Sequence, residues 1–98
     1  MTASAGDGLT FGQRFLERSD SYGQLCVGMD PHVGILEAWG LQVTVAGLET
    51  FSKTCVEAFA DIACVVKPQV AFYEQFGSAG LAVLEQSITE LRRAGVLV

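Results

Sequence analysis

Two short apolar runs, each ended by a charged residue and a proline, constrain the fold more than any other feature of the sequence. Residues 25–29 (LCVGM) precede Asp30, and residues 63–66 (ACVV) precede Lys67. The runs do not alternate polar and apolar residues and are too short for helices, which is typical of strands buried on both faces in a parallel sheet. The proline after each charged residue cannot donate to a ladder and ends the strand.

Three other segments have the apolar spacing of amphipathic helices. The first begins at Thr10, which has capping-box spacing with Gln13, and ends near residues 20–23. The other two are marked by Leu48, Phe51, Cys55, Val56 and Phe59, and by Leu81, Leu84, Ile88 and Leu91.

The connections between these elements are expected to be irregular. Residues 32–46 are predicted to be a loop with a short turn around residues 35–39, and residues 69–79 a loop containing aromatic side chains. Residues 96–98 (VLV) are expected to begin a third strand.

The alternation of strands and helices predicts an α/β fold with a parallel sheet and right-handed crossovers. We expect residues 1–9 to form a flexible tail and residues 10–98 an incomplete α/β domain. Because the sequence stops inside an apolar strand, it is expected to be the opening segment of a larger protein.

The composition excludes several classes of protein. Of the 98 residues, 50% are hydrophobic and 17% are charged, which argues against intrinsic disorder. No run reaches the roughly 18 apolar residues of a membrane span. The net charge of −5, without a cluster of Lys or Arg, argues against a nucleic-acid or anionic-membrane surface. The first residues lack the features of a secretory signal, so we expect a cytoplasmic protein with no membrane or nucleic-acid partner.

Cysteine and histidine give no metal signature. Cys26, Cys55 and Cys64 are odd in number and lack Cys-x-x-Cys spacing, so they are interpreted as buried, reduced thiols. His32 alone cannot build a metal site, and we predict none.

The strongest candidates for a functional site are Asp30 and Lys67, which end the two predicted strands. Adjacent parallel strands lie about 4.8 Å apart, and both side chains would emerge at the carboxyl edge of the sheet, where α/β proteins bind ligands. The alternative is a surface ion pair, which contributes little. Gln69 lies just past the second strand and is either a ligand-binding amide or a solvated loop residue.

Other polar and aromatic residues are given structural interpretations. His32 is expected to be an exposed loop residue rather than an acid or base. Phe72, Tyr73 and Phe76 are expected to pack under the loop rather than line a pocket. Residues 77–80 (GSAG) lack the Gly-Lys-Ser/Thr ending of a P-loop and are interpreted as the start of a helix.

Two segments resemble orotidine 5′-phosphate decarboxylase, in its longer bacterial branch. They are residues 25–32 (LCVGMDPH) and 65–74 (VVKPQVAFYE). Residues 36–40 (LEAWG) and 76–77 (FG) fit the same branch, and the resemblance extends over about residues 11–98.

This resemblance implies a (β/α)8 barrel of about 250 residues, of which residues 10–98 would form strands one to three. The family converts orotidine 5′-phosphate to UMP and CO2 in pyrimidine biosynthesis, uses no cofactor, and commonly forms homodimers. Asp30 matches the residue that contacts the ribose hydroxyls, and Lys67 matches the lysine that bonds to the ribose and to a neighbouring catalytic Asp. The family's Asp-x-Lys-x-x-Asp motif follows strand three and is absent here, so this chain alone is expected to be inactive.

Two alternatives remain open from the sequence. The first is another phosphate-binding (β/α)8 lyase or synthase, which would lack the Asp-x-Lys-x-x-Asp motif. The second is a non-catalytic, doubly wound signalling or binding module of the receiver type. That module would need an acidic pair after strand one, where this chain has the single Asp30.

Overall fold

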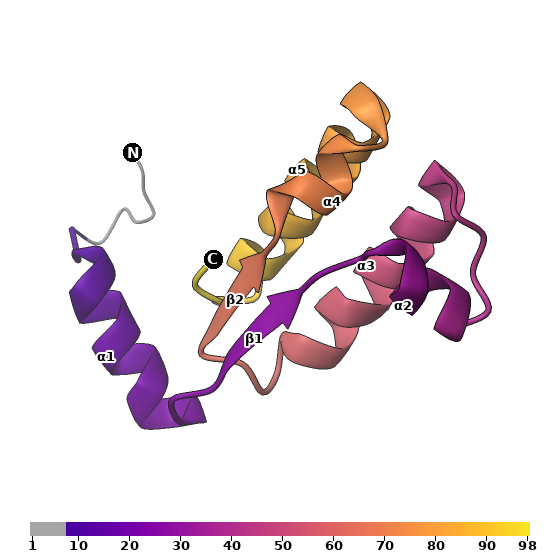
Figure 1. Cartoon of the computed structure of the whole chain (residues 1–98). Helices are drawn as coiled ribbons and strands as arrows, with labels where there is room; N and C mark the ends of the chain where they lie inside the picture. Colours follow the sequence, from indigo (N-terminus) through magenta and orange to yellow (C-terminus); the bar gives the residue numbers. More distant parts are fainter. Residues whose placement is uncertain (1–7) are drawn as a thin grey trace.

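Strands and helices alternate along the chain, as the sequence predicts. The computed structural model describes residues 8–98, so the predicted tail at residues 1–9 lies outside the described residues except for its last two positions. The elements, shown in Figure 1, are α1 (Phe11–Tyr22), β1 (Cys26–Met29), α2 (Val33–Ala38), α3 (Val45–Phe59), β2 (Val65–Pro68), α4 (Val70–Glu74) and α5 (Gly77–Arg93). Within residues 8–98, none of the helices combines the length and the apolar composition of a membrane span.

The sheet is parallel, and its order follows the sequence. β1 pairs with β2 in a register that places Gly28 opposite Lys67. The expected third strand is reduced to one parallel bridge, between Leu97 and Val65 of β2. Residue 97 therefore lies beside β2. In the receiver-type order, strand three lies beside strand one, so the strand order observed here does not fit a module of the receiver type.

Helices α3 and α5 pack against each other and cover one face of the sheet. On that face Met29 of β1 and Val66 of β2 are fully buried in a core formed with both helices. Successive strand residues point to opposite faces. Cys26, Gly28 and Lys67, which alternate with the buried positions, are exposed.

The prediction that the strands are buried on both faces is therefore wrong for one face. Within the described chain both long crossover helices lie on the same side, and the opposite face is bare. The prediction of buried thiols is wrong for Cys26, which lies on the bare face and is exposed. It is confirmed for Cys55 and Cys64, which are buried.

The ends of the long helices have the hydrogen bonds that the sequence predicts. Thr10 Oγ1 accepts from the Gln13 N–H at 3.1 Å, and Gln13 Oε1 accepts from the Thr10 N–H at 2.8 Å, which completes the capping box of α1. Gly95 has φ 86° after α5. Its N–H donates to the Arg92 carbonyl, and the Val96 N–H donates to the Leu91 carbonyl, which makes a Schellman motif that turns the chain back into the sheet.

The loop predicted for residues 69–79 is wrong, because it contains α4 and the start of α5. α4 has only five residues, too few to show helical periodicity. Its position depends on α5, against which it packs. A Cβ atom at Gly80 would overlap the Tyr73 carbonyl oxygen, so a glycine is needed where the two helices meet.

Tyr73 is buried and Phe76 packs against the same core, as the packing interpretation predicts. The loop predicted for residues 32–46 is also wrong in part, because it contains α2, which ends at Ala38 within the expected turn, and the first two residues of α3.

α1 lies at the amino ends of the strands (Figure 1) and buries none of its residues. It is attached through Arg18, whose guanidinium donates to the carbonyls of Ala60 at 2.8 Å, Ala63 at 3.1 Å and Ala94 at 3.3 Å. Ala60 and Ala94 are the C-caps of α3 and α5. Because helix carboxyl ends carry partial negative charge, the guanidinium is favourably placed against both.

Candidate active site

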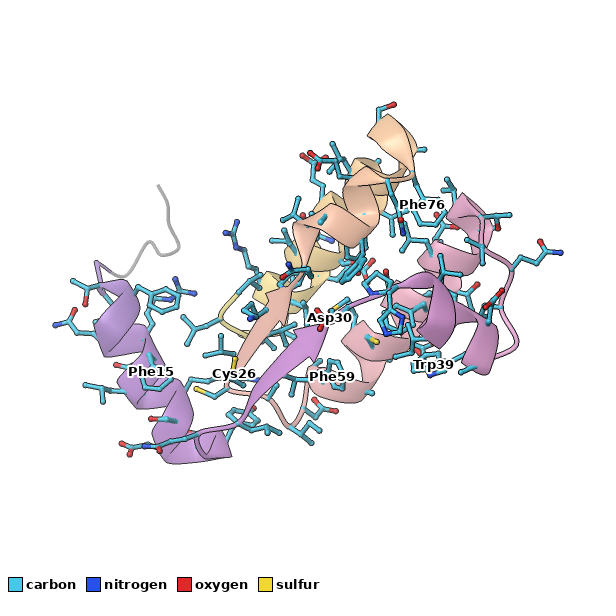
Figure 2. The ribbon with its side chains drawn as sticks, in the orientation of Figure 1. Phe15, Cys26, Asp30, Trp39, Phe59 and Phe76 are labelled. Atoms are coloured by element: carbon cyan, nitrogen blue, oxygen red, sulfur yellow. The ribbon has the colours of Figure 1, made fainter. Side chains whose placement is uncertain are left out.

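Asp30 and Lys67 lie at the same edge of the sheet. Asp30 directly follows the last residue of β1, and Lys67 is the third of the four residues of β2. Figure 2 shows Asp30 at the tip of β1 and Cys26 at the opposite end of the strand. Both charged residues are exposed. The sequence-based expectation that they meet at the carboxyl edge therefore agrees with the arrangement of the sheet.

The two side chains also share the bare face. A Cβ atom built on Gly28 would lie 3.5 Å from Oδ2 and 3.7 Å from Oδ1 of Asp30, so the carboxylate lies above Gly28. Gly28 is the register partner of Lys67, and partners in a parallel ladder point to the same face. The carboxylate and the lysine stem thus lie side by side on the face that no helix covers.

Neither side chain has a hydrogen-bond or ion-pair partner within residues 8–98. No hydrogen bond or ion pair joins the Asp30 carboxylate or the Lys67 ammonium to another side chain or to the backbone there. The structure therefore does not contain the surface ion pair considered as the alternative. A carboxylate that accepts and an ammonium that donates are left available to the hydroxyl and anionic groups of a ligand.

Gln69 lies at the same edge. Its backbone N–H donates to the Met29 carbonyl at 3.0 Å, which extends the pairing of β1 and β2 by one residue. Its side chain is exposed and does not cap α4. All three predicted site residues, Asp30, Lys67 and Gln69, therefore lie at the same edge of the sheet.

His32 has a structural role that sequence reasoning missed. It is exposed, as predicted, and its Nδ1 accepts the Ile35 N–H at 3.2 Å as the N-cap of α2. Its ring meets Phe72 edge-on, with centroids 5.9 Å apart. This contact links the segment after β1 to the segment after β2.

Tyr73 is a second residue whose role the sequence did not indicate. Its hydroxyl lies 2.9 Å from Ser52 Oγ in a buried hydrogen bond between α4 and α3. Burial raises the pKa of Tyr73, the Ser52 bond opposes that rise, and the charges of Cys55 and Asp30 add to it. The available signal was Ser52, a polar residue on the apolar face of its helix.

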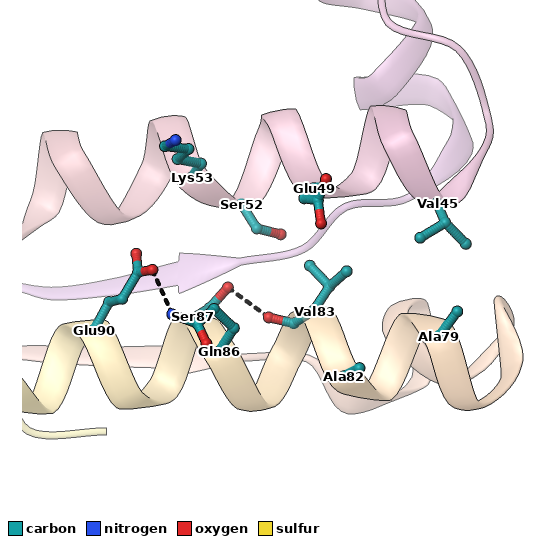
Figure 3. Close-up of a pocket in the computed structure, with 10 residues that line it drawn as sticks. All are labelled: Val45, Glu49, Ser52, Lys53, Ala79, Ala82, Val83, Gln86, Ser87 and Glu90. Atoms are coloured by element: carbon teal, nitrogen blue, oxygen red, sulfur yellow. Dashed lines mark hydrogen bonds between the residues drawn. The ribbon is translucent and has the colours of Figure 1, made fainter.

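A groove of about 570 Å³ lies away from this edge, between α3 and α5 (Figure 3). Four of its six polar side chains, Ser52, Gln86, Ser87 and Glu90, have hydrogen-bond partners in their own or neighbouring helices. Ser87 Oγ donates to the Val83 carbonyl at 2.9 Å, and Gln86 Nε2 donates to Glu90 Oε2 at 2.7 Å. The groove contains none of the predicted site residues and is a surface feature of two packed helices.

Two further observations bear on ligands. Residues 77–80 form the first turn of α5, as the helix-start interpretation predicts. Among residues 8–98, no group of three or more His, Cys, Asp or Glu side chains is arranged to hold a metal ion.

No model of a protein family matches the chain. Among curated proteins, it is 58% identical over 90 residues to orotidine 5′-phosphate decarboxylase of Corynebacterium glutamicum strain R, covering 92% of this chain and 32% of that protein. It is 57% identical over 88 residues to the Streptomyces coelicolor enzyme of the same name, covering 90% of this chain and 32% of that protein.

A solved structure has the same fold over the whole chain. It is a crystal structure assigned to orotidine 5′-phosphate decarboxylase from Streptomyces avermitilis MA-4680, with a TM-score of 0.88 and 48% identity, covering 100% of this chain and 34% of that one. The predicted resemblance is thus confirmed, and the fold is that of part of a (β/α)8 barrel. The chain spans about a third of the length of the relatives that it matches.

Proposed function

We propose that this chain provides the Asp30–Lys67 edge of an orotidine 5′-phosphate decarboxylase. That enzyme converts the nucleotide orotidine 5′-phosphate to UMP and CO2 in pyrimidine biosynthesis. The observation that carries the proposal is the placement of Asp30 and Lys67, unpaired, on one bare face at the carboxyl edge of the sheet. The identity of 54–58% to curated decarboxylases supports it.

Each of the three residues has a proposed role. The Asp30 carboxylate accepts hydrogen bonds from the ribose hydroxyls. The Lys67 ammonium donates to the ribose and pairs with a catalytic Asp that lies beyond the residues described. In this position the Lys67 ammonium contributes to a preorganised cationic environment for the carbanion that forms as CO2 leaves. The Gln69 amide hydrogen-bonds the substrate. This chemistry uses no cofactor.

The 98 residues alone are proposed to be inactive. The carbanion at C6 of the pyrimidine must receive a proton, and the sequence contains no Asp-x-Lys-x-x-Asp motif to supply the donor lysine. The active form is proposed to be a cytoplasmic homodimer that binds a small nucleotide and neither nucleic acid nor membrane.

A chimeric enzyme tests the proposal. This chain replaces the matched 90-residue segment of the Corynebacterium glutamicum strain R decarboxylase. We expect the chimera to restore growth without uracil to a bacterium lacking the decarboxylase, and to remove the absorbance of orotidine 5′-phosphate in vitro. The isolated chain is expected to do neither. A folded chimera without activity would contradict the proposed function.

Substitutions in the chimera test the roles. Lys67→Ala is expected to lower kcat about 100-fold or more, because it removes a charge aimed at the reacting centre. Asp30→Ala is expected to lower kcat/KM by about 10- to 100-fold, through lost ribose contacts. Lys53→Ala and Asp61→Ala remove the same charges from exposed positions outside the site and serve as matched controls. If Lys67→Ala behaves like Lys53→Ala, the assigned site is wrong.

A further inference from the structure

We propose that Gly28 is a positioning residue, whose missing side chain lets the Asp30 carboxylate lie over strand β1 beside Lys67. The consequence for catalysis rests on the proposed function. The placement itself rests on contacts within the chain.

The backbone does not explain a glycine at this position. The glycines with positive φ in residues 8–98 are Gly8, Gly23, Gly40, Gly77 and Gly95, and Gly28 is not among them. A glycine inside a strand weakens the strand, and it often marks a place where another group approaches the backbone closely. Gly28 lies within β1, so its small size needs another explanation.

The group that approaches Gly28 is the Asp30 carboxylate. A Cβ atom on Gly28 would have its three nearest neighbours in that one side chain, at 3.5, 3.7 and 3.9 Å. The carboxylate therefore folds back over the strand instead of extending past its end. Gly28 is the register partner of Lys67. This conformation of the Asp30 side chain therefore places its carboxylate beside the lysine on the neighbouring strand.

The distances from Gly28 to the Asp30 carboxylate predict different effects for an alanine and a valine at position 28. A Cβ atom alone, as in Gly28→Ala, would make ordinary contact with the carboxylate at 3.5 Å. The two additional methyl carbons of Gly28→Val extend about one bond length further and would occupy the space of the carboxylate oxygens. Valine also has a higher strand propensity than glycine, so a loss of folding is not expected from the backbone.

The test uses the chimera defined above. Gly28→Val is expected to lower kcat/KM by about 10- to 100-fold, as misplacement of a binding group by about 1 Å does. Gly28→Ala is expected to recover most of that loss. Cys26→Val places a valine side chain on the same face two residues earlier and is expected to stay close to the unsubstituted chimera. Equal activity of Gly28→Val and Gly28→Ala would overturn the proposal.

A double-mutant cycle distinguishes positioning from a general effect on folding. If Gly28 acts through Asp30, Gly28→Val is expected to have no further effect on kcat/KM in the Asp30→Ala background. An undiminished loss in that background would overturn the proposal.

A readout without activity separates this proposal from the proposed function. The ¹³C resonance of the Asp30 carboxyl group, assigned by its loss in Asp30→Ala, is expected to shift in Gly28→Val and to stay near its position in Cys26→Val. An unmoved resonance would overturn the positioning role even in an inactive chimera. An active chimera with an unmoved resonance would leave the proposed function intact.

Discussion

At the residue scale, Cys55 couples stability to alkaline pH. Burial raises the pKa of its thiol from 9.0 to about 11. Between these values the unfolded thiol has lost its proton and the native thiol keeps it, so the unfolded state binds fewer protons and stability falls as pH rises. We expect the chimera to lose about 2 kcal/mol from pH 9 to 11 through this thiol, measured by urea unfolding.

Cys55→Ala is the control for this pH dependence. It is expected to reduce the slope, leaving the part that Tyr73 contributes, because the pKa of Tyr73 is also raised by burial. An unchanged slope in Cys55→Ala would show that the thiol does not cause the effect.

The buried bond between Ser52 and Tyr73 gives a second prediction. Tyr73→Phe leaves the Ser52 hydroxyl without its 2.9 Å partner and is expected to cost about 1 to 2 kcal/mol of the chimera's unfolding free energy. Ser52→Ala is expected to cost a similar amount, and the double variant less than the sum. Tyr22→Phe, at an exposed tyrosine, is the matched control in denaturant unfolding. Additive losses would count against a coupled pair.

Some residues of the site can be predicted from the sequence, and others cannot. Asp30, Lys67 and Gln69 were predictable because each interrupts or follows an apolar run at the same end of a strand. The bond between Ser52 and Tyr73 was not, because these residues are 21 positions apart and meet only when α4 lies against α3. The role of Gly28 was also hidden, since it depends on the direction of one carboxylate.

At the element scale, length decides what the sequence predicts. α3 and α5 have 15 and 17 residues, enough to show a helical period, and both are found where expected. α4 has five residues and is held by contact with α5 at Gly80, so no local pattern indicates it. The bare face of the sheet was missed because apolar strand residues look alike in sequence, whichever face they occupy.

The attachment of α1 gives a third prediction. Arg18 contacts three carbonyls, two from the connection between α3 and β2 and one from the end of α5, and α1 has no buried residue to replace those contacts. Arg18→Ala in the chimera is expected to cost about 2 kcal/mol, because charged donors to partly buried acceptors are lost. Arg18→Lys is expected to recover little, since an ammonium cannot reproduce the planar fork.

Amide exchange and a charge-matched control test this attachment. Amide hydrogens of α1 are expected to exchange faster in Arg18→Ala. Arg14→Ala removes an arginine from the same helix whose side chain makes no hydrogen bond within residues 8–98. Equal effects of the two variants would refute a specific role for Arg18.

At the scale of the whole molecule, the sheet has one covered face, one bare face and an open edge at β1. The order of β1, β2 and residue 97 places successive strands side by side, and α3 packs against α5 on the covered side. In a (β/α)8 barrel the helices form the outer ring and the opposite face of the sheet turns inward. The bare face that carries Asp30 and Lys67 therefore corresponds to the interior of such a barrel.

This geometry predicts how the isolated chain behaves in solution. The outer edge of β1 presents unpaired N–H and C=O groups, and such edges pair with other chains. Two large apolar side chains are also exposed, Leu25 at 47% and Ile62 at 51%. We expect the isolated 98-residue chain to self-associate at micromolar concentration and to give broad, poorly dispersed amide resonances, in contrast to the chimera. Cys26→Lys places a charge on the bare face at β1 and is expected to reduce association in sedimentation velocity, while Lys53→Ala, on the outer helix, is not. Sharp, dispersed resonances from a monomer of the unsubstituted chain would contradict this prediction.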